Sequence, residues 1–454
     1  MTLRKLLAAF LPESQLGAGA SVLDGHSSDL SYHEPCHPDA VVYAESTEDV
    51  SRILAWANAE VVPVTAFGAG TSLEGHVIPV AGGISLDLSR LDRVLALRPA
   101  DLQADVQAGT LRSELNRVAA REGLWFTVDP GADATLGGMA ATNASGTTTV
   151  RYGGMRANVL ALEVVLADGS VIRPGSRTVK SSAGYDLKSL FVGSEGTLGV
   201  ITQLTVRLAG IPEHTVALRG SFPSLDSACQ CAATLAAAGV GVQRLELLDA
   251  PTIAAVNAYK GSAFAPAPTL FIEVAGTKAA VAGDAATVAD VANWEGCIEL
   301  VEAHEAEARS RLWEARHHVL FALLNESPGK VHRATDVCVP VSELAGAIAH
   351  ARQLADDLRL NAAIVAHAGD GNYHVLLMFD PEDPDERGRV DRLSTEIVGW
   401  ALARGGTCTG EHGIGLGKID HLEQEHSDLI PLFARLKESF DPNGILNPGK
   451  VIRA

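Results

Sequence analysis

The sequence predicts an α+β protein with two larger parts and a short C-terminal part. Residues 1–210 mix short strand and helix patterns without a regular βαβ repeat. The composition changes near Ile211-Pro212, after which alanine becomes more frequent and the helical patterns become longer. The final part is again rich in glycine. We therefore expect domains at 1–210 and 211–404, and a segment over 405–454 that returns to the first domain.

The helix expected at 46–60 shows how the elements of the first part are predicted. Ser46 or Thr47 can cap its first turn, and apolar residues then recur on one face. Asp168-Gly169 is a strong signal for a hairpin turn. The other elements expected here are strands at 61–65, 103–108, 161–167 and 170–172, and a helix over 111–121 that ends before Gly123.

Longer helical patterns dominate the second part. They cover residues 224–239, 278–292, 303–325 and 342–358, and a further helix is expected at about 427–439 in the last part. Strands are expected at 269–274 and on both sides of a turn within 362–379.

Charge and cysteine usage exclude some classes of function. The formal net charge of −19 argues against a nucleic-acid partner, because phosphate contacts need a basic surface, and argues more weakly against anionic lipid. The six cysteines never form C-x-x-C, so neither a disulfide framework nor an iron–sulfur site is expected. No run approaches the ~20 apolar residues of a membrane span, and the first apolar run is too short for a secretory signal. We expect a cytoplasmic protein, with peripheral docking at the inner face of a membrane left open.

A glycine loop over residues 68–75 follows a strand and is a candidate phosphate-binding loop. Closely spaced glycines let backbone N–H groups approach a pyrophosphate, although an ordinary tight turn explains the loop equally well when it is taken alone. Leu73 stands where a Rossmann fingerprint requires glycine. The later patch 413–418 is not a Walker A loop. That motif would require glycine at position 412, which is His412, and serine or threonine at position 419, which is Ile419. Two further segments rich in small residues, 130–146 and 193–201, would let backbone lie along an extended ligand.

Two histidines flank a predicted hairpin turn at Asp370-Gly371. If these two residues form the turn, His367 stands opposite His374, with Cβ atoms ~4.5–5.5 Å apart. Both imidazoles could then bind one divalent ion, whereas a slip of one residue would put them on opposite faces. The alternative is a pair of hydrogen-bonded histidines without a metal. Glu411-His412, in a glycine-rich loop, could add a carboxylate and a base.

These segments, in this order, resemble the flavoproteins of the vanillyl-alcohol oxidase / p-cresol methylhydroxylase (PCMH-type) superfamily. Within it, the match is to the group of D-lactate dehydrogenase (cytochrome), glycolate oxidase catalytic subunit and D-2-hydroxyglutarate dehydrogenase. The resemblance covers essentially the whole chain, including the tail 443–450. It implies a two-part FAD-binding domain and an α+β cap domain that binds substrate, with an antiparallel sheet flanked by helices.

The resemblance also implies the residues that bind FAD. The loop has no histidine for a covalent flavin bond between Gly68 and Gly75, and His76 lies just past it, so non-covalent FAD is expected. The implied cofactor-binding residues are Gly68, Ala69, Gly70, Thr71, Ser72, Thr135, Gly137, Gly138, Asn143, Ser145, Gly146, Val200, Ile201 and Asn447.

The implied chemistry is metal-assisted oxidation of a small D-2-hydroxy acid to the 2-oxo acid. By resemblance, His367, His374 and Glu411 hold Zn²⁺ or Mn²⁺, and His412 is the base. The metal lowers the pKa of the substrate hydroxyl while hydride leaves Cα for flavin N5. An arginine suits the substrate carboxylate: Arg316 matches the family's residue, and Arg333 and Lys330 are further candidates, each of which could instead be a salt-bridge residue.

D-lactate is the leading substrate, with glycolate and D-2-hydroxyglutarate as alternatives in the same family. Three other functions stay open: a metal hydrolase, a non-catalytic flavin-binding subunit, and a flavin enzyme acting on an alcohol, a phenol or an alkyl-glycerone phosphate. The acceptor is expected to be a quinone, a cytochrome, an electron-transfer flavoprotein, a partner subunit or oxygen, and not NAD. A homodimer is left open.

Overall fold

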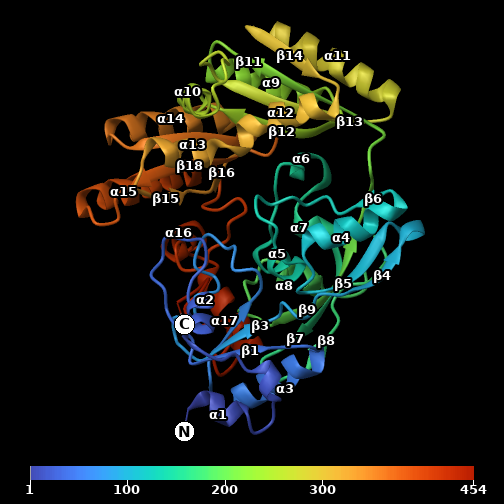
Figure 1. Ribbon diagram of the computed structural model, residues 1–454, viewed down its shortest axis with the longest axis vertical. Coiled ribbons are helices and arrows are strands. Elements are labelled where there is room, and N and C mark those ends of the chain that lie inside the picture. Colours follow the sequence, from blue (N-terminus) through green and yellow to red (C-terminus); the bar gives the residue numbers. More distant parts are fainter. Residues whose placement is uncertain (1, 454) are drawn as a thin grey trace. The chain divides into compact units, whose positions relative to one another are not determined.

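Two units of the chain each have their own core in the computed structural model, which describes residues 2–453 (Figure 1). The first unit contains the chain up to Gly146, Tyr152–Ile211 and everything from Glu411 onward. The second contains Thr147–Arg151 and Pro212–Gly410. The predicted α+β class is confirmed, because both units combine helices with mainly antiparallel sheets.

The first unit is built on two main sheets. A three-stranded parallel sheet has the order β1-β3-β2, and a five-stranded antiparallel sheet has the order β4-β5-β9-β7-β8. Its strands are β1 (Ala40–Tyr43), β2 (Val64–Phe67), β3 (Ile84–Asp87), β4 (Val94–Arg98), β5 (Gln103–Gln107), β6 (Leu124–Trp125), β7 (Val159–Val165), β8 (Val171–Ile172), β9 (Val200–Arg207) and β10 (Ala209–Gly210). Its helices are α1 (Leu3–Leu7), α2 (Ala20–Gly25), α3 (Thr47–Glu60), α4 (Arg112–Ala119), α5 (Leu136–Thr142), α7 (Met155–Asn158), α8 (Leu187–Phe191), α16 (Ile419–Glu425) and α17 (Ile430–Phe440).

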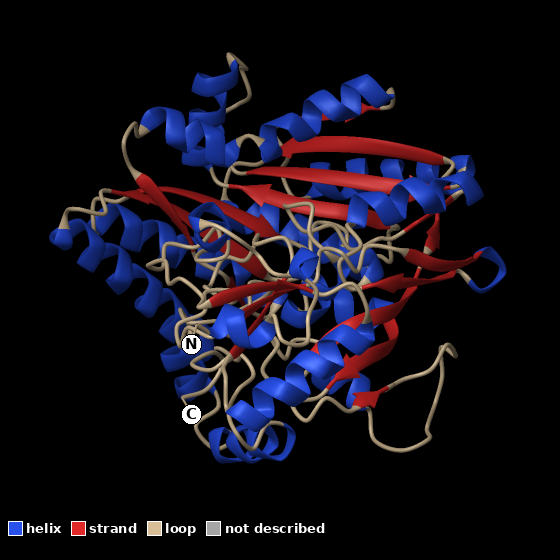
Figure 2. Cartoon of the chain, turned by 60° about the horizontal axis from the view of Figure 1, so that its bottom comes forward, coloured by secondary structure: helices blue, strands red, loops and turns tan. Residues whose placement is uncertain are grey.

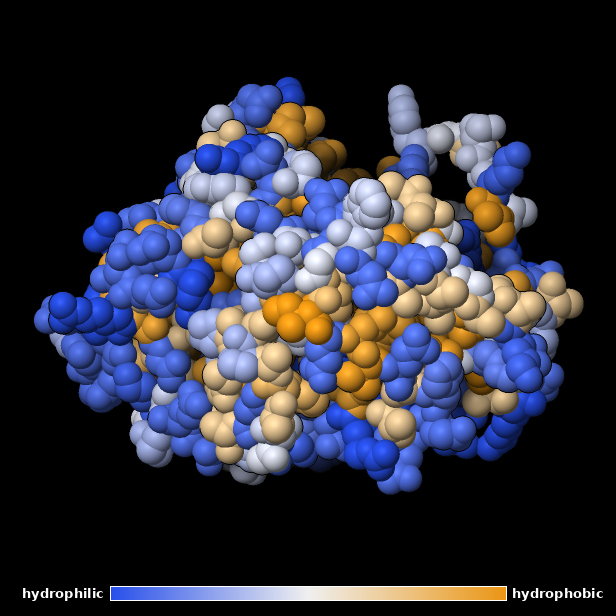
Figure 3. All heavy atoms as spheres, turned by 90° about the horizontal axis from the view of Figure 1, so that it is seen from above, coloured by the Kyte–Doolittle hydropathy of each residue, from blue (hydrophilic) through white to orange (hydrophobic). Residues whose placement is uncertain are grey.

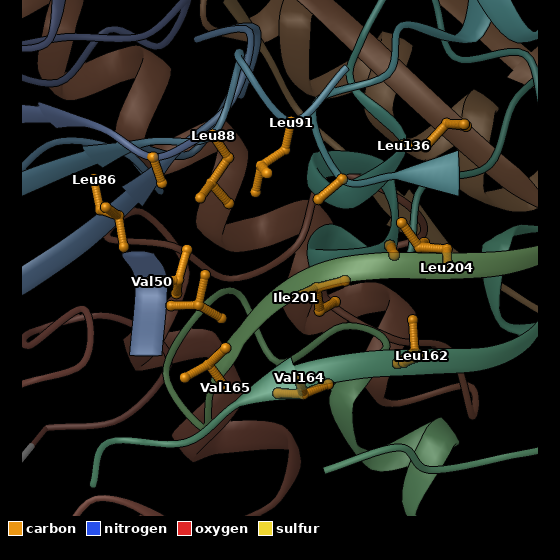
Figure 4. Packing of buried hydrophobic residues seen from close by; sticks show 14 of the residues in the cluster. Val50, Leu86, Leu88, Leu91, Leu136, Leu162, Val164, Val165, Ile201 and Leu204 are labelled. Atoms are coloured by element: carbon orange, nitrogen blue, oxygen red, sulfur yellow. The ribbon is translucent and has the colours of Figure 1, made fainter. Parts of the chain in front are cut away.

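Apolar side chains from both sheets and from α3 and α5 form the core of this unit. Figure 4 shows Ile201 of β9 close to Val164 of β7 and Leu204 close to Leu162, with Leu136 of α5 and Val50 of α3 in the same cluster. Burial of such surface stabilises a fold by roughly 25 cal/mol per Å². The C-terminal segment takes part in this core, because Ile445 and Leu446 belong to the same cluster.

Local sequence signals explain α3 and the hairpin of β7 and β8. Ser46 caps α3 by accepting a hydrogen bond from the Asp49 N–H, as predicted. The predicted apolar face of α3 is fully buried. Val165 pairs with Val171 in the antiparallel hairpin, which confirms the turn at Asp168-Gly169.

The second unit contains an eight-stranded sheet whose main path runs β14-β11-β13-β12-β17-β18-β15, with β16 also paired to β18. All of these pairs are antiparallel. The strands are β11 (His214–Ser221), β12 (Val242–Leu248), β13 (Thr269–Gly276), β14 (Glu299–Ala303), β15 (Val331–Ala334), β16 (Val337–Cys338), β17 (Asn361–His367) and β18 (Asn372–Phe379). The helices are α9 (Leu225–Ala237), α10 (Ala250–Lys260), α11 (Lys278–Trp294), α12 (Ala306–His317), α13 (Val319–Glu326), α14 (Leu344–Asp357) and α15 (Pro384–Leu402), and α6 (Thr149–Tyr152) begins in the short early segment.

The two faces of this sheet differ in chemistry. Helices α10, α12 and α13 cover one face, and α9, α11, α14 and α15 pack against the other. Helices (blue) are seen on both sides of strands (red) in Figure 2. The α9 side receives apolar strand residues such as Leu245, Ile272 and Val375. The α12 side carries buried charged residues, including Glu246 and Glu273, among apolar ones. Buried charges are stabilised by ion pairs, hydrogen bonds or metal ions. This polar face of the sheet is therefore the candidate location of a functional site.

The predicted single helix at 303–325 is wrong, because two helices meet at His318. The backbone N–H and Nδ1 of His318 both donate to the Glu314 carbonyl oxygen, at 3.0 and 2.7 Å. The helical hydrogen bond of the His318 N–H is thus kept, but the backbone of His318, with φ −93° and ψ 6°, departs from helical geometry. Helix α12 therefore ends at His317, and α13 begins at Val319.

Hydrophilic residues cover much of the face drawn in Figure 3, with hydrophobic residues between them. Within residues 2–453, the structure has no helix that is long and apolar enough to cross a membrane.

Candidate active site

The histidine hairpin has a different register from the one predicted. His367 pairs with Asn372, and Val365 pairs with His374, so the predicted pairing of His367 with His374 is wrong. The register differs by two residues, and side chains alternate with a period of two. Both histidines therefore still lie on one face, as diagonal neighbours. Their ring centroids are 5.4 Å apart with planes at 86°.

The loop between the strands explains this register. A two-residue type I′ turn needs positive φ at both central residues, but only Gly371 of the pair Asp370-Gly371 has it, at 78°. The chain instead forms a four-residue loop, Ala368–Gly371, in which the N–H groups of Asp370 and Gly371 donate to the His367 carbonyl oxygen. A side chain at 371 would collide with backbone, since a Cβ there would lie 2.0 Å from the Val339 carbonyl oxygen.

Both histidines are oriented through Nδ1. His367 Nδ1 lies 2.5 Å from Glu246 Oε1, and His374 Nδ1 lies 3.0 Å from the Thr335 carbonyl oxygen. A carboxylate and a carbonyl oxygen only accept hydrogen bonds, so each Nδ1 carries the proton. In the neutral rings the lone pair is then on Nε2. Histidines that bind metals are held in this way in proteins, so the pair fits a metal ion.

Glu246 links one of these histidines to Arg316. Its Oε2 accepts a hydrogen bond from Arg316 Nε at 2.8 Å, and its side chain is fully buried. Burial alone would raise the pKa of Glu246, but the hydrogen bonds from His367 and Arg316 and the positive charge of Arg316 lower it below its ordinary value. Glu246 is therefore an anion between a candidate metal ligand and a candidate substrate-binding residue.

A second buried carboxylate, Asp336, connects the hairpin to the segment before Glu411. Its Oδ1 accepts from Asn372 Nδ2 at 2.7 Å and lies 3.7 Å from His374 Nδ1. Its Oδ2 accepts from the Thr409 hydroxyl at 2.7 Å and from the Gly410 N–H at 2.8 Å. Asp336 thus fixes the backbone that leads into Glu411-His412.

Glu411 and His412 open the C-terminal part of the first unit, and their loop is also held at its far end. Glu195, which is buried, accepts hydrogen bonds from the N–H groups of Ile414 and Gly415 at 2.7 and 2.8 Å. Ser145, predicted as a flavin residue, donates to Glu411 Oε2 at 2.7 Å. The dipeptide therefore lies between two stretches of backbone, each anchored by a buried carboxylate of its own unit.

The predicted flavin-binding segments meet within the first unit. The loop after β2 lies against the start of α5, because a Cβ at Gly68 would come within 2.5 Å of the Thr135 hydroxyl oxygen. The N–H groups of Gly193 and Glu195 donate to carbonyl oxygens of α5 at 2.9 and 2.8 Å. Backbone at glycine and other small residues can approach an extended phosphate-bearing ligand closely, so the segments fit FAD.

The other predicted flavin residues occupy the same region. Asn143 ends α5 in the left-handed conformation, and a Cβ at Gly146 would lie 2.2 Å from a backbone oxygen of Asp129. Val200 and Ile201 are buried at the start of β9. Asn447 donates to the carbonyl oxygens of His76 and Glu195, which brings the C-terminal tail to the third glycine segment.

Arg333 and Lys330 are not brought to the histidine pair. Arg333 pairs with Leu377 and so lies on the opposite face of the sheet from His374. It donates to Asp391 of α15 at 2.6 Å, and Lys330 donates to Glu386 of the same helix at 2.6 Å. Arg316, in contrast, shares its partner Glu246 with the predicted metal ligand His367.

Sequence reasoning missed Glu246 and Asp336. Glu246 lies 121 residues before His367, in a strand that was not predicted. Its signal was a charged residue between leucines in the alternating segment Arg244–Leu248. Asp336 lies three residues after Arg333 in sequence, and no local pattern distinguishes it from an exposed loop carboxylate.

Two family comparisons identify the chain. Residues 38–175 match the family described as FAD binding domain, and residues 211–451 match FAD linked oxidases, C-terminal domain. The chain belongs to the FAD-linked oxidase family. The predicted superfamily is thereby confirmed.

Relatives of this family member cover nearly its full length. A probable mitochondrial D-lactate dehydrogenase of Danio rerio is 43% identical, with 96% of this chain and 89% of the relative covered. A mitochondrial D-lactate dehydrogenase [cytochrome] of Arabidopsis thaliana is also 43% identical, over 93% of this chain and 75% of the relative. Glycolate oxidase subunit GlcD of Bacillus subtilis is 35% identical, over 94% and 91%.

Solved structures agree on the fold of this oxidase. P-cresol methylhydroxylase with substrate bound has a TM-score of 0.80 at 18% identity, with 99% of this chain and 96% of that chain covered. An alkyldihydroxyacetonephosphate synthase has a TM-score of 0.78 at 20% identity, over 98% and 85%. At such low identity these likenesses establish the PCMH-type fold alone.

Proposed function

We propose that this FAD-linked oxidase oxidises a small D-2-hydroxy acid, D-lactate first, to the 2-oxo acid with the help of a divalent metal. The observation that carries the proposal is that Glu246 binds both His367 and Arg316, one through each carboxylate oxygen. A 2-hydroxy acid has a carboxylate for a cation and a hydroxyl for a metal, and these groups suit such a pair. The names of the relatives point to the same substrate class.

The proposed metal ligands are His367 and His374 through Nε2, and Glu411 through its carboxylate. Two nitrogen ligands and one oxygen ligand suit Zn²⁺ or Mn²⁺ and leave positions open for substrate. The Nδ1 contacts of both histidines support this assignment. Glu411 directly follows Gly410, whose N–H is bound by the same Asp336 that binds Asn372 of the hairpin.

The remaining residues would orient the substrate and move its proton. Arg316 would grip the carboxylate, and Glu246 would keep the guanidinium turned toward it. His412 would take the hydroxyl proton as general base. When bound, the metal lowers the pKa of the substrate hydroxyl and FAD accepts the Cα hydrogen as hydride.

FAD is proposed to bind non-covalently to the first unit. The meeting of Gly68 with Thr135, and of Asn447 with the 193–201 segment, supports the predicted binding residues. His76, the histidine just past the glycine loop, is buried against Glu195. On this view 1–210 and 405–454 bind the flavin and 211–404 binds substrate.

A cytochrome is the proposed electron acceptor. Several relatives carry that word in their names. The same relatives are named as mitochondrial, so the expected cytoplasmic location stays a prediction, as does the homodimer.

The test is an anaerobic titration of the purified flavoprotein with D- and L-lactate, glycolate and D- and L-2-hydroxyglutarate. D-lactate should bleach the flavin absorbance at the lowest concentration. EDTA should abolish the bleaching, and Zn²⁺ or Mn²⁺ should restore it. Absence of bleaching by any 2-hydroxy acid would refute the proposal, and bleaching unaffected by EDTA would refute the metal.

Glycolate is the second candidate substrate, because the GlcD relative is 35% identical. The same titration distinguishes the two substrates. Bleaching by glycolate at concentrations where D-lactate has no effect would replace D-lactate as the substrate.

A further inference from the structure

Glu246 occupies a central place on the polar face of the eight-stranded sheet. It lies on β12 directly opposite His367 of β17, so the two side chains are cross-strand neighbours. Arg316 reaches Glu246 from α12. Each carboxylate oxygen therefore has one strong donor, His367 Nδ1 at 2.5 Å and Arg316 Nε at 2.8 Å.

These contacts restrict both partners. The hydrogen bond from Nδ1 fixes the ring of His367 in the tautomer and rotamer that present Nε2 as a ligand. The ion pair through Nε fixes the plane of the Arg316 guanidinium and leaves its two terminal amino groups for a further acceptor. Because Glu246 is fully buried, water does not replace either contact when one is lost.

We propose that Glu246 is a positioning residue that couples metal affinity to carboxylate binding, because it orients His367 and Arg316 with its two oxygens. The inference rests on the proposed function and extends it to a residue that contacts neither metal nor substrate. A glutamine at 246 has the same shape but one acceptor end and one donor end. Its oxygen can accept a hydrogen bond from His367 or from Arg316, and its NH₂ group then faces the N–H of the other residue, so that two donors meet.

Glu273 provides a matched control on the same face of the sheet. It is a buried glutamate on the neighbouring strand β13, and its two oxygens also bind several side chains: Trp313 Nε1 at 3.0 Å, Gln243 Nε2 at 3.0 Å and Arg244 Nη1 at 3.3 Å. None of these partners is a predicted ligand or substrate residue. Glu273→Gln therefore reproduces the loss of a buried charge without changing the histidine pair.

The experiment measures Zn²⁺ and Mn²⁺ affinity by competition with a chelator, in wild-type flavoprotein, Glu246→Gln and Glu273→Gln. We expect Glu246→Gln to bind metal about 10–100-fold more weakly, the range for the loss of a group that orients a metal ligand. Its KM for the hydroxy acid should rise as well. Glu273→Gln should keep both values near wild type, and all three proteins should keep their flavin spectrum.

Equal metal affinity in Glu246→Gln and wild type would overturn the inference. If wild type and Glu273→Gln bind no metal, the proposed function itself fails. If Glu246→Gln does not fold, Glu246→Asp replaces it, since it retains the charge but is one methylene too short to reach both partners. Unchanged metal affinity in a folded Glu246→Asp variant would likewise overturn the inference.

Discussion

A histidine meets a buried glutamate in each unit, and the two pairs differ in what the glutamate holds besides the histidine. In the first unit, His76 Nε2 lies 3.2 Å from Glu195, whose oxygens also accept from the backbone N–H groups of Ile414 and Gly415. In the second unit, Glu246 holds His367 by Nδ1 and binds the side chain of Arg316.

The difference predicts a structural role for Glu195 and, if the proposed function holds, a role in ligand binding for Glu246. Glu195 holds backbone, so it fixes the path of the loop that follows His412. Glu246 holds two side chains in defined orientations, His367 through Nδ1 and Arg316 through Nε. These contacts leave Nε2 of His367 and the terminal amino groups of Arg316 for a ligand. Similar ion-pair chemistry therefore predicts loss of stability in the first unit and loss of ligand binding in the second.

The largest effect is expected from replacing His412, which lies between the backbone segments held by Asp336 and by Glu195. His412→Ala should lower kcat by about 10²–10⁴-fold, the contribution of a general base, and should keep the flavin spectrum. Steady-state kinetics with D-lactate measures the loss. His426→Ala is the control, because this histidine is partly exposed and pairs with the neighbouring Glu425 in the same C-terminal segment. Near wild-type turnover in His412→Ala would remove the base from the mechanism.

An intermediate effect separates Arg316 from Arg333. Hydrogen bonds to charged groups contribute roughly 1.5–3 kcal/mol, so Arg316→Gln should lower kcat/KM by about 10–100-fold, mainly through KM. Arg333→Gln should change kcat/KM by only a few-fold, because Arg333 pairs with the exposed Asp391 on the other side of the sheet. Similar losses in both variants would contradict the assignment of Arg316 alone to the substrate carboxylate.

Periodic patterns explain what the sequence could predict. The capped helix α3 and the hairpin after β7 depend on residues close in sequence, and both were predicted. The register of the histidine hairpin was wrong by two residues, yet both histidines stayed on one face because side chains alternate with a period of two. The local pattern therefore predicted that His367 and His374 share one face of the sheet, although it did not predict the geometry of the turn.

Contacts between distant residues could not be predicted in this way. No local pattern pairs Glu246 with His367 across 121 residues, since that contact depends on the order of strands in the sheet. The same holds for Asp336 and Gly410, 74 residues apart. Arg333 was a second candidate after Arg316, and the pairing of β15 with β18, which no local pattern predicts, places it on the other face.

The smallest expected effect concerns the pair in the first unit, and its dependence on pH sharpens the comparison. Burial alone would lower the pKa of His76, but the negative charge of Glu195 at 3.2 Å, with Glu74 and Asp29 nearby, raises it above the ordinary value of 6.5. A raised pKa in the folded state stabilises the fold fully below pH 6.5, and this contribution is lost as pH rises through the raised value. The pKa of Glu195 is lowered in spite of its burial, mainly by His76, so its contribution persists at mildly acidic pH.

His76→Gln should therefore lower the melting temperature most at pH 6, by a few degrees, and less as the pH becomes alkaline. Thermal unfolding of the flavoprotein across this range measures the difference from wild type. His37→Gln is the control, because His37 pairs with Asp24 in the same unit but both side chains are exposed, and such a pair contributes little. A deficit in His76→Gln that grew with pH would reverse the sign of the argument. A large loss of turnover with unchanged melting would instead mean that the first-unit pair acts in function, as the second-unit pair is proposed to do.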